Sequence, residues 1–161
     1  MPIKDAVRTN ILSRNWRYKW YTLQDLVFDN RCYWGPGDWR QMRENFGRAV
    51  KAILDVHPNS RKFELSCWLY SPMDYLDDCI NTLSTKSIQE IVINLRFYGG
   101  YPSYETPSDL YKCQHLVHLK LIGCVQIIPP SFKRFMSLVT LYLDNVELPV
   151  DLVKNTNDSR N

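Results

Sequence analysis

The side chains best suited to chemistry are three histidines and a pair of adjacent carboxylates. His57, His115 and His118 lie outside any H-E-x-x-H motif. Asp77 and Asp78 fall in a segment expected to be helical, where adjacent side chains do not face each other. The sequence also lacks a G-x-S-x-G motif and a glycine-rich phosphate loop. We therefore expect no catalytic residue, no cofactor and no metal site.

The cysteines support the same expectation. Their number is odd, and no two of them form a C-x-x-C pair, so neither a disulfide framework nor a zinc site is indicated. Reduced cysteines packed as small apolar side chains fit best, and they indicate a reducing compartment, the cytoplasm and/or the nucleus. The five cysteines are Cys32, Cys67, Cys79, Cys113 and Cys124.

The composition suits one domain with a buried core. The chain has 161 residues, of which 45% are hydrophobic and 13% aromatic. Its net charge of +3 is mild, and no run of five basic residues occurs, so we expect no nucleic-acid partner. No apolar stretch approaches the roughly 18 residues of a membrane span, and the first residues lack the apolar region of a signal peptide. We expect no membrane partner.

A leucine pattern recurs along the chain. The segments LVHLKLIGC (116–124) and LVTLYLDNV (138–146) share the form L-x-x-L-x-L, offset by 22 residues. Three weaker copies precede them, which gives five copies at spacings of 37, 28, 28 and 22 residues. Such periods are typical of leucine-rich repeats. The weaker copies lie in LQDLVF (23–28), SRKFELSCW (60–68) and IQEIVINLR (88–96).

Each copy predicts a short strand with one apolar face. A single strand of this kind cannot bury that face alone, so stacked copies should form a parallel sheet. The connectors 38–57 and 71–83 carry helical stripes of apolar residues, whereas the later connectors predict loops with at most a helical turn near 109–111 and 131–134. The pattern predicts an α/β fold, a short leucine-rich-repeat solenoid with helices and loops on its convex side. The alternative is an α/β domain whose strands are merely rich in leucine.

The residues between the leucines should share the open, concave face of that sheet. Aligning the five copies places these residues in rows that mix charged, apolar and aromatic side chains. A surface of this kind suits a protein partner better than a phosphate backbone. The alternative is that most of them are ordinary solvated strand residues. The residues expected to bind a target protein are His118, Lys120, Thr140, Tyr142 and Asp144.

The first twenty residues predict two short helices. Pro2 suits the entry to the first helix, and Ser13 is a good N-cap for the second. The second helix would carry Trp16 and Trp20 on one face. An exposed tryptophan there could anchor a partner, or both rings could pack beneath the first repeat as a cap.

With the repeats behind it, the segment PIKDAVRTNILSRNWRYKW (2–20) resembles the second half of the F-box in plant F-box/leucine-rich-repeat proteins of the FBD/LRR type. The segments 23–30, 110–124 and 135–148 are similar to the parts that follow the F-box in that family. The resemblance implies a substrate-recognition subunit of an SCF-type E3 ubiquitin ligase. It would bind a Skp1-like adaptor through the F-box and an unknown target protein through the repeats. The adaptor-binding residues that it implies are Pro2, Ile3, Val7, Leu12, Ser13 and Trp16.

The match to the F-box is incomplete. Met1 occupies the position of the last apolar residue of the first F-box helix, so we expect that helix to be absent and adaptor binding to be weakened. The expected organisation is a partial helical F-box at 1–21, a repeat region at 22–149 and a polar tail at 150–161. The alternative function is a free-standing repeat scaffold that binds proteins without recruiting a ligase.

Overall fold

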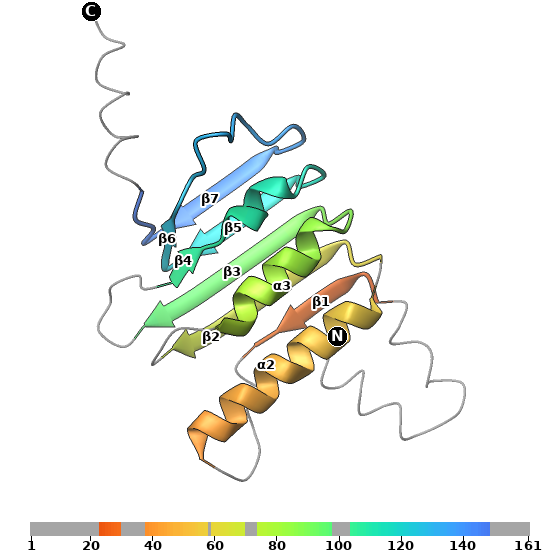
Figure 1. Cartoon of the computed structure of the whole chain (residues 1–161), viewed down its shortest axis with the longest axis vertical. Coiled ribbons are helices and arrows are strands. Elements are labelled where there is room, and N and C mark those ends of the chain that lie inside the picture. Colours follow the sequence, from red (N-terminus) through yellow and green to blue (C-terminus); the bar gives the residue numbers. More distant parts are fainter. Residues whose placement is uncertain (1–22, 30–37, 58, 70–73, 98–103, 149–161) are drawn as a thin grey trace, which may run out of the picture.

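A computed structural model of the chain describes residues 23–29, 38–57, 59–69, 74–97 and 104–148. Within these ranges the dominant element is a five-stranded sheet in the order β1-β2-β3-β5-β7, and every neighbouring pair is parallel. Figure 1 shows the strands side by side in chain order, from β1 in red to β7 in blue. The strands span Asp25–Phe28 (β1), Lys62–Leu69 (β2), Glu90–Phe97 (β3), His118–Ile122 (β5) and Thr140–Asp144 (β7).

The repeat predicted from the sequence is present in the backbone hydrogen bonds. Just before each of the first four sheet strands, one carbonyl oxygen accepts bonds from two successive N–H groups of the next copy. The first of these carbonyls bonds Arg61 N at 2.7 Å and Lys62 N at 3.0 Å. The accepting carbonyls belong to Gln24, Arg61, Gln89 and Val117. Equivalent positions of the five copies are therefore in register across the whole sheet.

Alternate residues of the strands point into the core, as the period of two predicts. In the first four sheet strands the inward side chains are buried, and Leu26, Phe63 and Leu65 are fully covered. In β7 the equivalent side chains are not: Leu141 is 54% exposed and Leu143 is 39% exposed. The apolar core thus extends from β1 to β5 and opens at β7.

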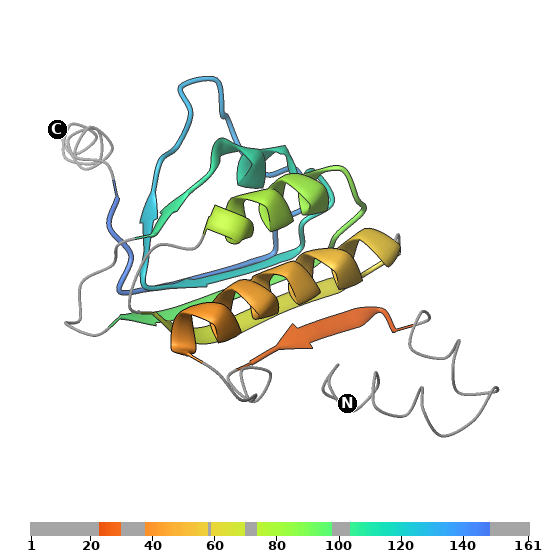
Figure 2. The ribbon, with the colours of Figure 1, turned by 60° about the horizontal axis from the view of Figure 1, so that its bottom comes forward.

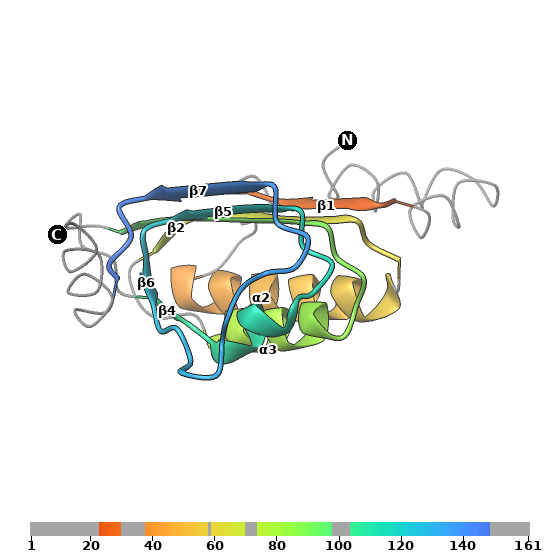
Figure 3. The ribbon, with the colours of Figure 1, turned by 90° about the horizontal axis from the view of Figure 1, so that it is seen from above.

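Two helices cover the inward face of the sheet. They are α2, at Trp39–Val56, and α3, at Asp74–Ser84. Seen edge on, the sheet forms one layer and the helices lie together on one side of it (Figures 2 and 3). Both helices lie in the segments predicted to be helical. The residues of their predicted apolar stripes that are buried are Phe46, Val50, Leu54, Leu76, Cys79, Ile80 and Leu83.

The end of α2 is held by a side chain from the loop after α3. The helix ends at Val56, before His57, as predicted. The Nζ of Lys86 donates hydrogen bonds to the carbonyl oxygens of Leu54 and, at 2.8 Å, His57. A cation placed against the carbonyl oxygens at a helix C-terminus is favourable. Burial nevertheless lowers the pKa of Lys86, because desolvation penalises its charged form.

The later connectors contain more structure than the sequence indicated. A second, two-stranded parallel sheet joins β4, at Tyr104–Thr106, to β6, at Cys124–Gln126. It lies where the chain leaves the large sheet for the helix layer (Figure 3). The 3-10 helix η3, at Ser108–Lys112, confirms the predicted helical turn. The turn expected near 131–134 is instead a single hydrogen-bonded turn, with Phe132 N bonded to Pro129 O at 2.9 Å.

The predicted α/β fold with parallel strands and with helices on one face of the sheet is thus found, and it is compatible with a leucine-rich-repeat arrangement. The expected F-box segment 1–21 and the expected tail 150–161 lie outside the described residues. No helix among those described is long and apolar enough to cross a bilayer.

Candidate functional site

The face of the sheet opposite the helices carries the residues that the repeat alignment predicts for target binding. Strand pairing places them in the expected rows, because each strand partner lies directly opposite the next. No described helix covers this face (Figure 3). The first row runs Asp25, Lys62, Glu90, His118 and Thr140, and the second runs Val27, Glu64, Val92, Lys120 and Tyr142.

The charges on the β1–β3 half of this face pair with one another. Lys62 Nζ lies 3.0 Å from Glu64 Oε2 and 2.9 Å from Glu90 Oε1. The hydrogen bond to Glu90 is the main reason that the pKa of Lys62 is raised. At the edge, the guanidinium of Arg61 lies 3.3 Å from Asp25 Oδ1. The charged side chains named here are therefore paired with one another, and this half of the face is close to neutral.

The β5–β7 half is different. Lys120 Nζ lies 4.7 Å from the centroid of the Tyr142 ring, a cation–π contact between neighbouring strands. Among the described residues, no carboxylate forms an ion pair with Lys120. His118, one row away on the same strand, is exposed. A positive charge thus stands on this half without a neutralising partner in the described part of the chain.

A shallow hollow of about 440 Å³ lies over β3, β5 and β7 at this point. Four of the five predicted target-binding residues line it, and the fifth, Asp144, lies beyond it near the end of β7. The repeat alignment placed Glu90 and Val92 in the same rows but did not single them out. The lining residues are Glu90, Ile91, Val92, His118, Leu119, Lys120, Thr140 and Tyr142.

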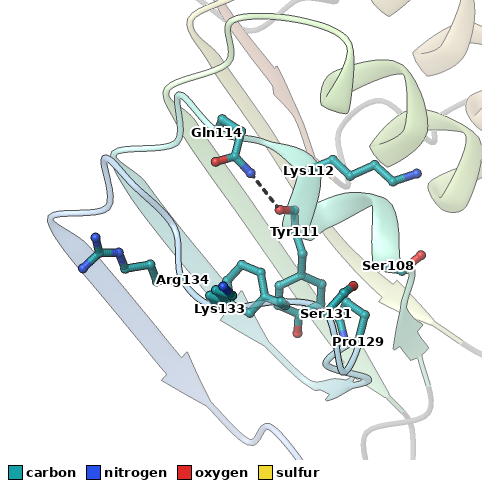
Figure 4. A pocket seen from close by; sticks show the side chains of 9 residues that line it. Ser108, Tyr111, Lys112, Gln114, Pro129, Ser131, Lys133 and Arg134 are labelled. Carbon is teal, nitrogen blue, oxygen red and sulfur yellow. Dashed lines mark hydrogen bonds between the residues drawn. The ribbon is translucent and has the colours of Figure 1, made fainter.

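A second hollow, of about 380 Å³, lies on the convex side beside η3 (Figure 4). It carries Lys112, Lys133 and Arg134, and their side chains point in different directions rather than toward one centre. Lys112 is paired with Asp109. The ring of Tyr111 packs against Phe132 at 4.6 Å between centroids. This hollow therefore belongs to the packing of the connectors.

Two of the polar groups first considered for chemistry, His57 and Asp77, have structural partners. His57 is 1% exposed, and its Nδ1 lies 2.7 Å from the carbonyl oxygen of Ile53. Asp77 accepts a hydrogen bond of 2.6 Å from the hydroxyl of Tyr104, which links α3 to β4. Burial and this bond raise the pKa of that hydroxyl. No group of three potential metal ligands occurs within the described ranges.

Four of the cysteines are described, and all four are buried thiols. Burial raises the pKa of Cys79, Cys113 and Cys124 to about 12 in each case. Their burial agrees with the expected packing of cysteines as small apolar side chains. The predicted adaptor-binding residues Pro2, Ile3, Val7, Leu12, Ser13 and Trp16 lie outside the described residues.

The chain is similar to proteins of Arabidopsis thaliana along nearly its whole length. An F-box/FBD/LRR-repeat protein is 33% identical over 156 residues, which cover 96% of this chain and 36% of the relative. F-box/LRR-repeat protein 13 is 32% identical, over 96% of this chain and 35% of its own length. A further F-box/FBD/LRR-repeat protein is 26% identical, over 94% of this chain and 35% of its own length.

The chain spans about a third of the length of these curated relatives. No protein-family model matches the sequence, and no solved structure matches it. The relatives therefore confirm the resemblance seen in the sequence, and none of their names denotes an enzyme.

Proposed function

The chain is a relative of plant F-box/LRR-repeat proteins, and on this premise we propose that it serves target recognition in an SCF-type E3 ubiquitin ligase. In this proposal the repeat region, 22–149, binds the target protein. The segment 1–21 is the F-box part that contacts a Skp1-like adaptor. The cytoplasm and/or nucleus is the proposed location, in keeping with the odd number of cysteines and the burial of the four that are described.

One observation carries the target-binding half of the proposal. The face of the sheet opposite α2 and α3 is uncovered among the described residues, and it bears a hollow with an aromatic ring and an unneutralised cation at its centre. Exposed aromatic residues beside a polar rim are the usual anchors of protein–protein contacts. The five predicted target-binding residues, His118, Lys120, Thr140, Tyr142 and Asp144, all lie on β5 and β7.

The adaptor-binding half rests on the resemblance of residues 2–20 to the F-box and on relatives that cover 96% of the chain. The residues proposed to contact the adaptor are Pro2, Ile3, Val7, Leu12, Ser13 and Trp16. Interface energy is concentrated in a few central residues, so single substitutions among these six should have a large effect on adaptor binding.

The test is direct binding of the purified chain to a Skp1-like adaptor, measured by biolayer interferometry up to about 100 μM. We expect saturable binding that Trp16→Ala weakens about tenfold or more, the range of a hot-spot aromatic. Tyr142→Ala is the matched control, because it removes an aromatic ring from the sheet face and should leave adaptor binding unchanged. Absence of binding over this range would contradict the ligase proposal and favour a free-standing repeat scaffold.

A further inference from the structure

From the charges on the open face, we infer that the target docks an acidic segment there. An aspartate or glutamate of an extended target segment would bind Lys120, with His118 beside it. A neighbouring apolar side chain of the target would lie in the hollow against Tyr142. This inference rests on the proposed function, because it names the chemistry that the same face would recognise.

The first argument is the difference between two lysines on one face. Lys62 and Lys120 both point outward from neighbouring parts of the same sheet, in adjacent rows. Lys62 already has two carboxylates within 3.0 Å, so an incoming acid gains little there. Lys120 contacts an aromatic ring instead, and a carboxylate is a stronger partner for an ammonium than a ring is. An aspartate or glutamate side chain of the target should therefore bind Lys120 rather than Lys62.

The second argument is the position of the acidic residues around Lys120. Glu90 borders the hollow on β3 and is held by Lys62. Asp144 lies further along β7, outside the hollow. Like charges placed around a site repel an acid from the wrong position and so contribute specificity. The same carboxylates disfavour a phosphate backbone, which needs several cations along its length.

The third argument is the shape of the hollow. It extends over three adjacent strands, which corresponds to roughly 10 Å at the usual spacing between strands. Its floor includes Val92 and the ring of Tyr142, so it offers an apolar contact next to the cation. A width of this order accommodates one extended segment with a single large side chain. The combination fits a target motif in which an acidic and an apolar residue lie close together.

The test is a selection of random twelve-residue peptides displayed on phage, using the whole chain as bait. Four baits are compared: the wild type, Lys120→Glu, Lys133→Glu and Tyr142→Ala. Lys133→Glu is the matched control, because Lys133 is exposed on the convex side and its substitution changes the net charge equally. Circular dichroism and thermal melting verify that each variant folds, and Lys120→Gln replaces Lys120→Glu if the latter does not.

We expect the wild type and Lys133→Glu to select peptides that combine aspartate or glutamate with an aromatic or large aliphatic residue. Lys120→Glu should bind these peptides about tenfold less tightly and should select basic residues instead. Peptides that need Tyr142 but show no acidic preference would overturn this inference and leave the proposed function standing. Peptides that bind equally well to the wild type and to Tyr142→Ala would overturn both the inference and the proposal that this face binds the target. Displacement of the peptides by a twelve-nucleotide single-stranded DNA would also overturn the inference.

Discussion

The ammonium group of Lys120 lies 4.7 Å from the centre of the Tyr142 ring, although the two residues belong to different repeats. Strand pairing places them opposite each other on β5 and β7. The contact holds the lysine over the face without neutralising it, because a ring carries no net charge. It thereby joins an aromatic anchor and a cation at one point of the open face.

Tyr142→Ala should weaken the binding of peptides selected on the wild-type chain by about tenfold, as expected for loss of a contact worth about 1.4 kcal/mol. The ring is 48% exposed, so the variant should unfold at nearly the wild-type temperature. Fluorescence anisotropy with labelled peptides measures the affinity. Val139→Ala is the control, since Val139 is exposed but lies outside the hollow. Equal losses for the two variants would contradict the assignment.

Leu121→Ala and Leu143→Ala should differ in stability although the two leucines are partners in the same row. Leu121 is 1% exposed, and its truncation should lower the free energy of unfolding by about 2–5 kcal/mol through lost burial and a cavity. Leu143 is 39% exposed, so Leu143→Ala should lower the free energy of unfolding by less than about 1.5 kcal/mol. Urea denaturation measures both values. Similar costs would show that the core extends to β7 in solution.

Gly47→Ala should destabilise the chain, although alanine normally favours a helix by about 1 kcal/mol over glycine. A Cβ at position 47 would overlap with the ring of Tyr75 on α3. Overpacking of this kind costs about 1–3 kcal/mol. Arg48→Ala, on the exposed side of the same turn, should change stability by less than about 0.5 kcal/mol. A gain in melting temperature for Gly47→Ala would refute the close packing of α2 against α3.

Lys86→Met should lower the free energy of unfolding by about 1–3 kcal/mol, because the substitution removes two charge-assisted hydrogen bonds from the end of α2. The bonds lost are those to Leu54 O and His57 O. Thermal melting followed by circular dichroism measures the effect. Lys112→Met is the control, because the side chain of Lys112 is largely exposed and contacts only Asp109 among the ion pairs of the described residues. If the two variants melt together, Lys86 does not cap the helix.

The buried thiols should make the chain less stable in alkali. Their pKa of about 12 exceeds the ordinary value of 9.0, so the unfolded chain releases these protons at lower pH than the folded chain. Stability is therefore retained below pH 9 and lost as the pH rises toward 12, by about 1.4 kcal/mol per pH unit for each thiol. Denaturation midpoints at pH 8 and pH 10 measure this loss. Cys113→Ala should reduce the slope, and an unchanged slope would contradict burial of that thiol.

The sequence determined the strands of the large sheet and the faces of its helices. Leu119 and Leu121 alternate with His118 and Lys120, and such alternation predicts both a strand and its buried face. The offset of 22 residues likewise predicted that Lys120 and Tyr142 share a row. Strand β4 was missed, because three residues among glycines and prolines carry no detectable period. Its partner β6 lies about twenty residues away and is found only in the folded chain.

Only the tertiary structure decided which charge on the open face remains available. In the sequence, Lys62 and Lys120 both occupy outward-facing positions of the repeat alignment, in adjacent rows. In the structure, Lys62 lies within 3.0 Å of both Glu64 and Glu90, whereas Lys120 contacts a ring. The periodic pattern fixes the row of each residue, but the rotamers that its side chain and its neighbours adopt decide its ionic partners. A long, flexible side chain such as that of lysine can reach several partners, and the three-dimensional packing around it decides which partner it contacts. The sequence pattern does not contain that information.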